Sequence, residues 1–317
     1  MWSIILLVYD PLDTFAQSGA LEQTVASVLT LRGDYELLIV NNNPLASSVR
    51  LPAMLRELEQ RNPGRVRVLS PDANLGSARG FNYALQQSDR QSEFVAFMSG
   101  DAEVIDLDML TKLEEAFWSS PSAGILHPLS VFEDAEGYNI SRRYSASQYF
   151  RSVRNGDPFD PETFDPPLKQ ELLRRAKSGA GIQAPLVNMP LTFTAIRRRM
   201  LDQVGSFDEG VRFACGENID LAFRALRAGF LVGRANGTCI YHRRYLFYRL
   251  THPEGARQMP HAGPLEQAGQ WWLSKWGRPY REVYFEWRWG KPVYKLAFPF
   301  FYCIRMLGTL KRRLVWG

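Results

Sequence analysis

The stretch FVAFMSGDAE, residues 94–103, indicates the class of fold that this chain adopts. Five apolar residues, Phe94–Met98, have the length of a buried strand, and they run into two carboxylates, Asp101 and Glu103. Side chains two residues apart on an extended chain face the same side, so both acids are expected to project together from the strand end. Such oxygen ligands suit Mg²⁺ or Mn²⁺. The competing interpretation is that Asp101 caps a following helix, or that both acids are simply solvated.

Outward from this stretch, short apolar runs alternate with amphipathic segments over the first 130 residues. Runs of strand length, rich in Ile, Val, Leu and Phe, lie at 3–9, 35–40, 66–69, 94–98 and 124–126. Helical spacing of apolar residues occupies 21–31, 51–58, 77–85 and 107–117. This alternation predicts an α/β fold with a mostly parallel central sheet flanked by helices, in which ligands bind at the carboxyl ends of the strands.

The pattern breaks after residue 130. Residues 131–186 contain several Asp-Pro pairs, which form turns, and we expect an inserted or mobile loop region there. Regular structure resumes near residues 191–196. Beyond that point, the periodicity predicts helices over 199–204 and 217–228 and a strand over 231–241.

Length and composition narrow the class of protein. A chain of 317 residues that is 45% hydrophobic is long and apolar enough for a globular core, which excludes wholesale disorder and a polytopic membrane protein. Three widely spaced cysteines argue against a disulfide framework and against a cysteine-ligated zinc site. The apolar start, Met1–Asp10, has no basic leader and is too short for a signal peptide, so we predict a buried strand and a reducing compartment.

The positive charge is concentrated at the C-terminal end. Residues 271–317 hold ten Lys and Arg, two Glu and six of the eight Trp, whereas the rest of the chain is net negative. The apolar run 293–302 is too short to span a bilayer and is followed by basic residues, so we expect a segment that lies on an anionic membrane surface. A helix packed on the domain, or a dimer contact, is the alternative. We predict one domain over 1–245 and a C-terminal extension over 246–317.

Polar residues follow the other predicted strands. Tyr9 ends the first strand and Asn42 the second, where polar groups can bond the base and ribose of a nucleotide, although such residues also cap turns. Asn74 and Arg79 flank the start of the helix after the third strand, where an N-terminus and a guanidinium suit a phosphate.

Three further residues near the end of the predicted domain are candidates for chemistry. Glu217 and Asp220 lie three residues apart in the first turn of a predicted helix, on one side of it. The helix dipole favours acids there and Asp220 can pair with Arg224, so a structural role competes with that of a general base. His242 ends a strand and can ligate a metal, although a lone histidine more often does not.

Taken in order, these motifs resemble the inverting glycosyltransferases of family 2, which have the nucleotide-sugar-binding fold called GT-A. The similarity is greatest to the bacterial rhamnosyltransferase-like members that build O-antigen and other surface polysaccharides. It covers about residues 2–130 and 187–245. It implies a UDP- or dTDP-sugar donor, Mg²⁺ or Mn²⁺, a glycan or lipid-linked glycan acceptor and no nucleic acid. It also places the protein in the cytoplasm, at the inner face of the cell membrane.

The resemblance assigns roles position by position. The nucleotide-binding positions correspond to Tyr9, Asn42, Asn74, Arg79 and Asp101. The metal-binding positions correspond to Asp101, Glu103 and His242. In the catalytic acidic motif, Asn218 stands where many members carry Asp, so Glu217 is the first candidate base and Asp220 the second.

Two other functions stay open at this point. A sugar-1-phosphate nucleotidyltransferase would carry a glycine-rich basic loop after the first strand, where this chain has an acidic loop, residues 9–13. A non-catalytic scaffold of a polysaccharide assembly complex is compatible with Asn41, Gly100 and Asn218, which depart from the family pattern. The sequence leaves the oligomeric state open.

Overall fold

The structure is a computed structural model, and it describes residues 1–10, 13–43, 49–130, 161–186, 191–210, 216–243 and 262–277. The chain divides into two compact units, Met1–His261 and Ala262–Gly317, whereas the sequence analysis places the boundary after residue 245. In the second unit the structure describes helix α12 (Ala262–Trp276), on which Trp272 and Trp276 stack with ring centroids 5.4 Å apart. The run 293–302 and the basic residues after it lie outside the described residues.

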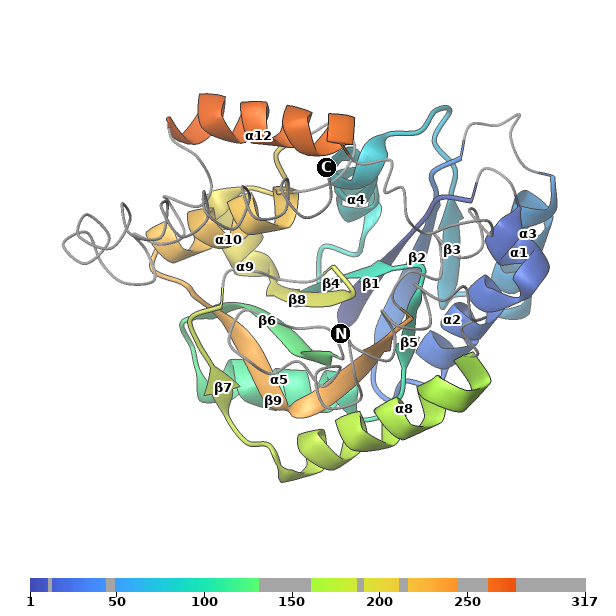
Figure 1. The fold of residues 1–317 in the computed structure, drawn as a ribbon, viewed down its shortest axis with the longest axis horizontal. Coiled ribbons are helices and arrows are strands. Elements are labelled where there is room, and N and C mark those ends of the chain that lie inside the picture. Colours follow the sequence, from blue (N-terminus) through green and yellow to red (C-terminus); the bar gives the residue numbers. More distant parts are fainter. Residues whose placement is uncertain are drawn as a thin grey trace, which may run out of the picture. The chain divides into compact units, whose positions relative to one another are not determined.

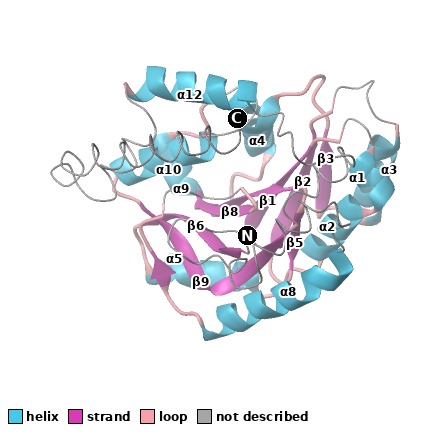
Figure 2. Ribbon diagram, in the orientation of Figure 1, coloured by secondary structure: helices cyan, strands magenta, loops and turns pink. Residues whose placement is uncertain are grey.

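The first unit is built around one mixed sheet with flanking helices (Figure 2). The strand order is β3-β2-β1-β4-β8-β6-β9-β5, and β7 pairs with β9. The strands are β1 (Trp2–Val8), β2 (Tyr35–Asn41), β3 (Val66–Leu69), β4 (Phe94–Ser99), β5 (Ala102–Val104), β6 (Ala123–Ser130), β7 (Ile182–Gln183), β8 (Phe193–Arg197) and β9 (Leu231–His242). The helices are α1 (Thr14–Ser18), α2 (Ala20–Leu29), α3 (Arg50–Arg61), α4 (Gly76–Gln87), α5 (Met109–Ser119), α8 (Pro161–Ser178), α9 (Arg198–Val204) and α10 (Glu217–Arg227).

The sheet changes character halfway across. Strands β3, β2, β1 and β4 are all parallel, as the alternating pattern predicts. Strand β8 runs antiparallel to both β4 and β6, and β5 and β7 run antiparallel to β9, while β6 and β9 are parallel. The α/β class with a central sheet and flanking helices is therefore confirmed, but the parallel arrangement is restricted to the first four strands and to the β6–β9 pair.

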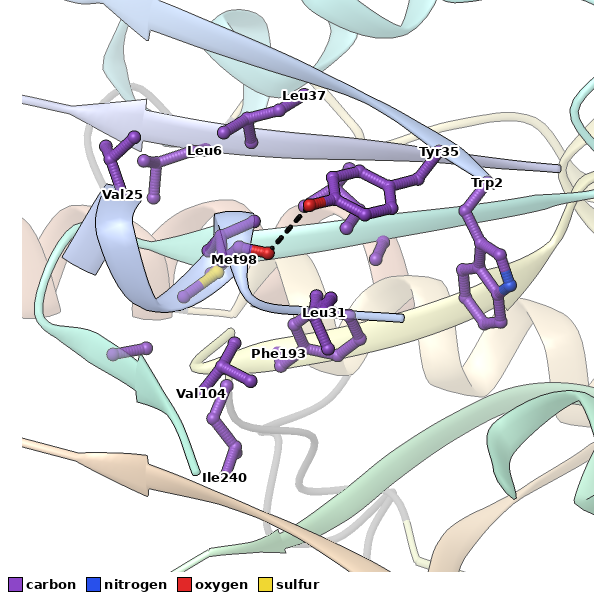
Figure 3. Close-up of a cluster of buried hydrophobic side chains, with 14 of the residues drawn as sticks. Trp2, Leu6, Val25, Leu31, Tyr35, Leu37, Met98, Val104, Phe193 and Ile240 are labelled. Carbon is purple, nitrogen blue, oxygen red and sulfur yellow. Dashed lines mark hydrogen bonds between the residues drawn. The ribbon is translucent and has the colours of Figure 1, made fainter. Parts of the chain in front are cut away.

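One face of the sheet packs on α2 and α5 to form the main core (Figure 3). Leu6 of β1 and Met98 of β4 point to this face, and Val25 of α2 packs against it. The hydroxyl of Tyr35 donates a 2.9 Å hydrogen bond to the carbonyl of Val28, so the one polar atom of this buried ring is satisfied. Strands of a parallel sheet that is covered by helices are buried, which explains why these strands are almost wholly apolar.

The opposite face of the sheet carries α4, which leads into the site described below. A Cβ atom on Gly80 would lie 2.6 Å from Cδ1 of Leu7 and 3.7 Å from Nδ2 of Asn42. A side chain at this position would require Leu7 to move, so glycine favours the close approach of α4 to β1 and β2.

Residues 161–178 form helix α8, so the loop predicted from the Asp-Pro pairs is wrong for this segment. The helix lies along β9 (Figure 1). Leu172 and Ala176 are buried in a small cluster with Cys239 of β9. Burial against the sheet outweighs the local preference for turns. Of the rest of the predicted loop, residues 179–186 are described and contain β7, whereas residues 131–160 lie outside the described residues.

The packing of α8 predicts a large difference between two neighbouring leucines. Leu172 is 0% exposed and Leu173 is 39% exposed. We expect Leu172→Ala to lower the free energy of unfolding by about 2–5 kcal/mol, because it leaves a cavity between helix and sheet. Leu173→Ala is expected to change it by about 0.5 kcal/mol. Urea unfolding of the two variants measures the difference, and equal effects would show that α8 is not a packed part of the domain.

Candidate active site

Polar side chains gather where β2, β1 and β4 end side by side in the sheet. Tyr9, directly after β1, is 42% exposed. Its neighbour Asp10 is fully buried, and one carboxylate oxygen accepts a 2.9 Å hydrogen bond from the backbone N–H of Ala16. Asp10 therefore shapes the connection to α1 and α2, whereas Tyr9 is exposed at the end of β1.

The acidic loop after β1 serves to cap a helix. The carboxylate of Asp13 accepts hydrogen bonds from the backbone N–H groups of Val49, Arg50 and Leu51, at 3.0, 3.1 and 2.9 Å. These are donors at the start of α3, and an anion is favoured there by the helix dipole. Sequence reasoning misses this role because Asp13 and the helix that it caps are separated by more than 30 residues.

Asn42 is 3% exposed, and both ends of its amide are engaged. Nδ2 donates to the carbonyl of Gly76 at 3.2 Å, and Oδ1 accepts from the N–H of Leu75 at 2.8 Å. The exposed Asn74 makes a local turn by accepting from the N–H of Gly76 at 2.8 Å. This side chain thus holds the loop that leads into α4, and its contact with a nucleobase stays a prediction.

Asp101 and His242 come together across the β5–β9 pair, in which Ala102 lies opposite His242. Oδ2 of Asp101 is 3.2 Å from Nε2 of His242. Burial alone would raise the pKa of Asp101, but the attraction of His242 and its hydrogen bond lower that pKa below the usual value. The pair thus offers an ionised carboxylate and an imidazole nitrogen at the edge of the sheet.

Glu103, the third predicted metal ligand, is engaged elsewhere. Oε1 accepts a 2.7 Å hydrogen bond from Nζ of Lys169 on α8, and Oε2 lies 3.6 Å from Nε of the buried Arg243. The carboxylate of Glu103 thus joins α8 to the sheet, and its role as a metal ligand stays a prediction. Within the described ranges, no three His, Cys, Asp or Glu side chains are grouped in a way that could hold a metal ion.

Helices α4 and α10 begin next to each other, and Glu217 lies between them. Gly216 has a φ of 104°, a left-handed conformation that suits glycine, and it starts α10. Glu217 in the first turn is 2% exposed. Its Oε1 accepts a 2.6 Å hydrogen bond from the hydroxyl of Ser77, in the first turn of α4.

Asp220, the second candidate base, is fully buried. Its Oδ2 accepts a 2.8 Å hydrogen bond from Nε of Arg224, which confirms the predicted ion pair. The other guanidinium nitrogens of Arg224 donate to the carbonyls of Val204 and Ser206, each at 2.6 Å. Asp220 thus orients the arginine that ties α10 to the turn after α9.

The same turn is held from the other side by α4. Nδ2 of Asn82 donates to the carbonyl of Phe207 at 2.8 Å, and Oδ1 accepts from the N–H of the same residue at 3.2 Å. Arg79, one helical turn earlier, lies 3.6 Å from Glu209, and both side chains are exposed. The sequence analysis does not single out Asn82. Its position on the apolar face of the helix predicted over 77–85 indicates a buried polar residue, which usually has a hydrogen-bond partner.

Comparison with known proteins agrees with this geometry. Residues 12–205 match the model of glycosyl transferase family 2, which is more than half of the chain. The chain belongs to glycosyl transferase family 2. No curated protein matches it significantly.

Solved structures share the fold at low sequence identity. The structure of GalNAc-T7 with UDP, GalNAc and Mn²⁺ matches with a TM-score of 0.53 and 13% identity, over 76% of this chain and 43% of that one. The mannosyltransferase PcManGT from Pyrobaculum calidifontis, in complex with GDP-Man and Mn²⁺, matches with a TM-score of 0.51 and 14% identity, over 100% of this chain and 81% of that one. The chain thus spans less than half the length of GalNAc-T7. The GT-A fold is confirmed.

Within the described part of the chain, no helix is both long enough and apolar enough to span a membrane.

The bonds of Asn42 generate a prediction about stability. We expect Asn42→Asp to lower the free energy of unfolding by about 1–3 kcal/mol, because a carboxylate cannot donate to the carbonyl of Gly76 and both groups are buried. Asn74→Asp, at an exposed position that uses only its oxygen, is the matched control, and its effect is expected to be about 0.5 kcal/mol. Chemical denaturation compares them, and an Asn42→Asp protein as stable as the control would contradict this assignment.

Proposed function

We propose that this glycosyltransferase transfers a sugar from a UDP- or dTDP-sugar to a hydroxyl of a glycan or lipid-linked glycan, with inversion and with the help of Mg²⁺ or Mn²⁺. The observation that carries the proposal is the Asp101–His242 pair at the carboxyl end of the parallel strands. Ligands of α/β proteins bind at this edge. The two solved neighbours support the choice of ligand, since each is described with Mn²⁺ and a nucleotide or nucleotide sugar.

The residues at this edge fit a divalent cation. Asp101 offers a carboxylate, and His242 in its neutral form offers an imidazole nitrogen. Mg²⁺ and Mn²⁺ are held by few protein groups when substrate phosphates complete the coordination. A cation bound here would stabilise the negative charge of the departing diphosphate.

Glu217 is the general base in this proposal. Its carboxylate takes the proton from the acceptor hydroxyl while the acceptor oxygen forms a bond to the anomeric carbon. The bond from that carbon to the diphosphate oxygen breaks on the opposite side, and its electron pair leaves with the diphosphate. Asp220 is less suited to this role, because Arg224 already holds its carboxylate.

Two accessible residues are proposed to contact the nucleotide. The ring of Tyr9 is exposed at the end of β1, and the guanidinium of Arg79 is exposed near the start of α4. An exposed aromatic ring can stack on a base, and an arginine near a helix N-terminus suits a phosphate.

The setting of the reaction is proposed from the sequence resemblance. The enzyme acts in bacterial surface polysaccharide synthesis, in the rhamnosyltransferase-like branch of the family, at the cytoplasmic face of the membrane. The basic and aromatic residues of 271–317 support attachment to an anionic lipid surface.

The metal site is tested through the binding of the donor. A thermal-shift panel of UDP-, dTDP- and GDP-sugars with Mn²⁺ first identifies the donor that stabilises the protein most. Asp101→Asn is expected to weaken Mn²⁺-dependent affinity for that donor by about 100-fold, since one of two protein ligands loses its charge. Calorimetry measures the affinity, with Asp108→Asn, an exposed acid paired with Arg32, as the matched control. Unchanged affinity in Asp101→Asn would remove Asp101 from the metal site.

The base is tested by kinetics with the same donor. Glu217→Gln is expected to lower kcat for donor turnover by a factor on the order of 10²–10⁴ with little change in donor affinity. Asp220→Asn is expected to act mainly on stability, because it weakens the bond that orients Arg224. Turnover and urea unfolding of both variants separate the two roles. If Asp220→Asn loses turnover at unchanged stability while Glu217→Gln keeps it, Asp220 is the base.

A further inference from the structure

We propose that Ser77 is a positioning residue for Glu217: its hydroxyl holds Oε1 of the carboxylate, so that Oε2 receives the proton of the acceptor. The proposal rests on the role of Glu217 as the base and goes beyond it, because it assigns different tasks to the two oxygens. It also gives the first turn of α4 a part in catalysis that is separate from contact with the nucleotide.

The contact itself is short and joins distant parts of the chain. The hydroxyl of Ser77 lies 2.6 Å from Oε1 of Glu217, and 140 residues separate the two in sequence. Hydroxyl–carboxylate bonds at 2.5–2.7 Å are charge-assisted and about twice as strong as bonds between neutral groups. A glutamate has three side-chain torsions, and a fixed bond to one oxygen restricts the direction in which the other oxygen points.

The two helices are held in place by bonds that neither Ser77 nor Glu217 makes. Asn82 ties α4 to both backbone groups of Phe207. Arg224 ties α10 to the carbonyls of Val204 and Ser206, just before Phe207. Loss of the Ser77 hydroxyl is therefore expected to remove one orienting bond from the carboxylate while the helices stay where they are.

This geometry separates a positioning role from a structural one. If Ser77 only stabilised the packing of α4 on α10, its removal would lower the melting temperature and leave kcat unchanged. If it orients the base, its removal lowers kcat at constant KM for the donor, because the proton transfer occurs in the transition state and not in the binding of the donor.

The experiment uses the full chain, Mn²⁺ and the nucleotide sugar that stabilises the protein most in the thermal-shift panel. Ser77→Ala is expected to lower kcat about 10- to 100-fold with KM for the donor unchanged, and Ser77→Thr, which keeps the hydroxyl, to restore most of it. Ser77→Cys has nearly the same size but a weak donor, so it is expected to behave like Ser77→Ala and serves if the alanine variant folds poorly. Ser88→Ala is the matched control for loss of a serine hydroxyl, because Ser88, at the other end of α4, bonds the carbonyl of Leu85 and accepts from Nη2 of Arg198.

The pair is then combined with Glu217→Gln. If Ser77 acts through Glu217, adding Ser77→Ala to Glu217→Gln causes no further loss of kcat. A further loss as large as in the wild-type background would overturn the proposal, as would a normal kcat in Ser77→Ala or Ser77→Cys. In those cases an inactive Glu217→Gln would still leave Glu217 as the base. An active Glu217→Gln would instead contradict the proposed function itself.

Discussion

The candidate site depends on one partly buried interaction, the ion pair between the fully buried Asp220 and Arg224. The guanidinium of Arg224 is bound by this carboxylate and by carbonyls of the turn between α9 and α10. Removal of one partner from a buried pair leaves an uncompensated charge, which is among the most costly changes in a protein interior. The pair therefore fixes where α10 starts, and Glu217, one turn earlier on the same helix, meets Ser77 because of it. Asp220, through its pair with Arg224, thus helps to position Glu217.

Several polar residues that follow the strands make hydrogen bonds that build the site. Asp10 and Asp13 accept hydrogen bonds from the backbone at α1 and α3, and Asn42 holds the loop before α4. Glu103 joins α8 to the sheet. A loop at the edge of a sheet exposes many backbone donors and acceptors, and nearby side chains are the usual partners for them. Polar residues at strand ends thus indicate where a site lies, but they do not by themselves indicate which side chain contacts a ligand.

The fold was largely predictable from the sequence, whereas the partners in the site were not. Apolar runs such as Phe94–Met98 are buried wherever they fall, so the positions of the strands follow from pattern alone. The direction of β8 and the helix over 161–178 depend on packing between distant segments, which local pattern does not contain. The bond from Lys169 to Glu103 is of the same kind, because it joins a carboxylate at a strand end to a helix more than 60 residues away. The Asp220–Arg224 pair was predictable because helical spacing brings its members together.

The Asp101–His242 pair is held by the backbone around it. The N–H of Arg243 donates to the carbonyl of Asp101 at 2.9 Å, so the two strand ends are joined directly beside the pair. The hydroxyl of Thr24 on α2 donates to the carbonyl of Gly100 at 2.9 Å, and Nη2 of the buried Arg243 bonds the same hydroxyl at 3.1 Å. One arginine thus connects α2, the residue before Asp101 and the end of β9. Because these bonds use main-chain atoms of Gly100 and Asp101, they do not require a side chain at position 100. The glycine that departs from the family pattern is therefore compatible with a rigid carboxylate at the next residue, which is what a metal ligand requires.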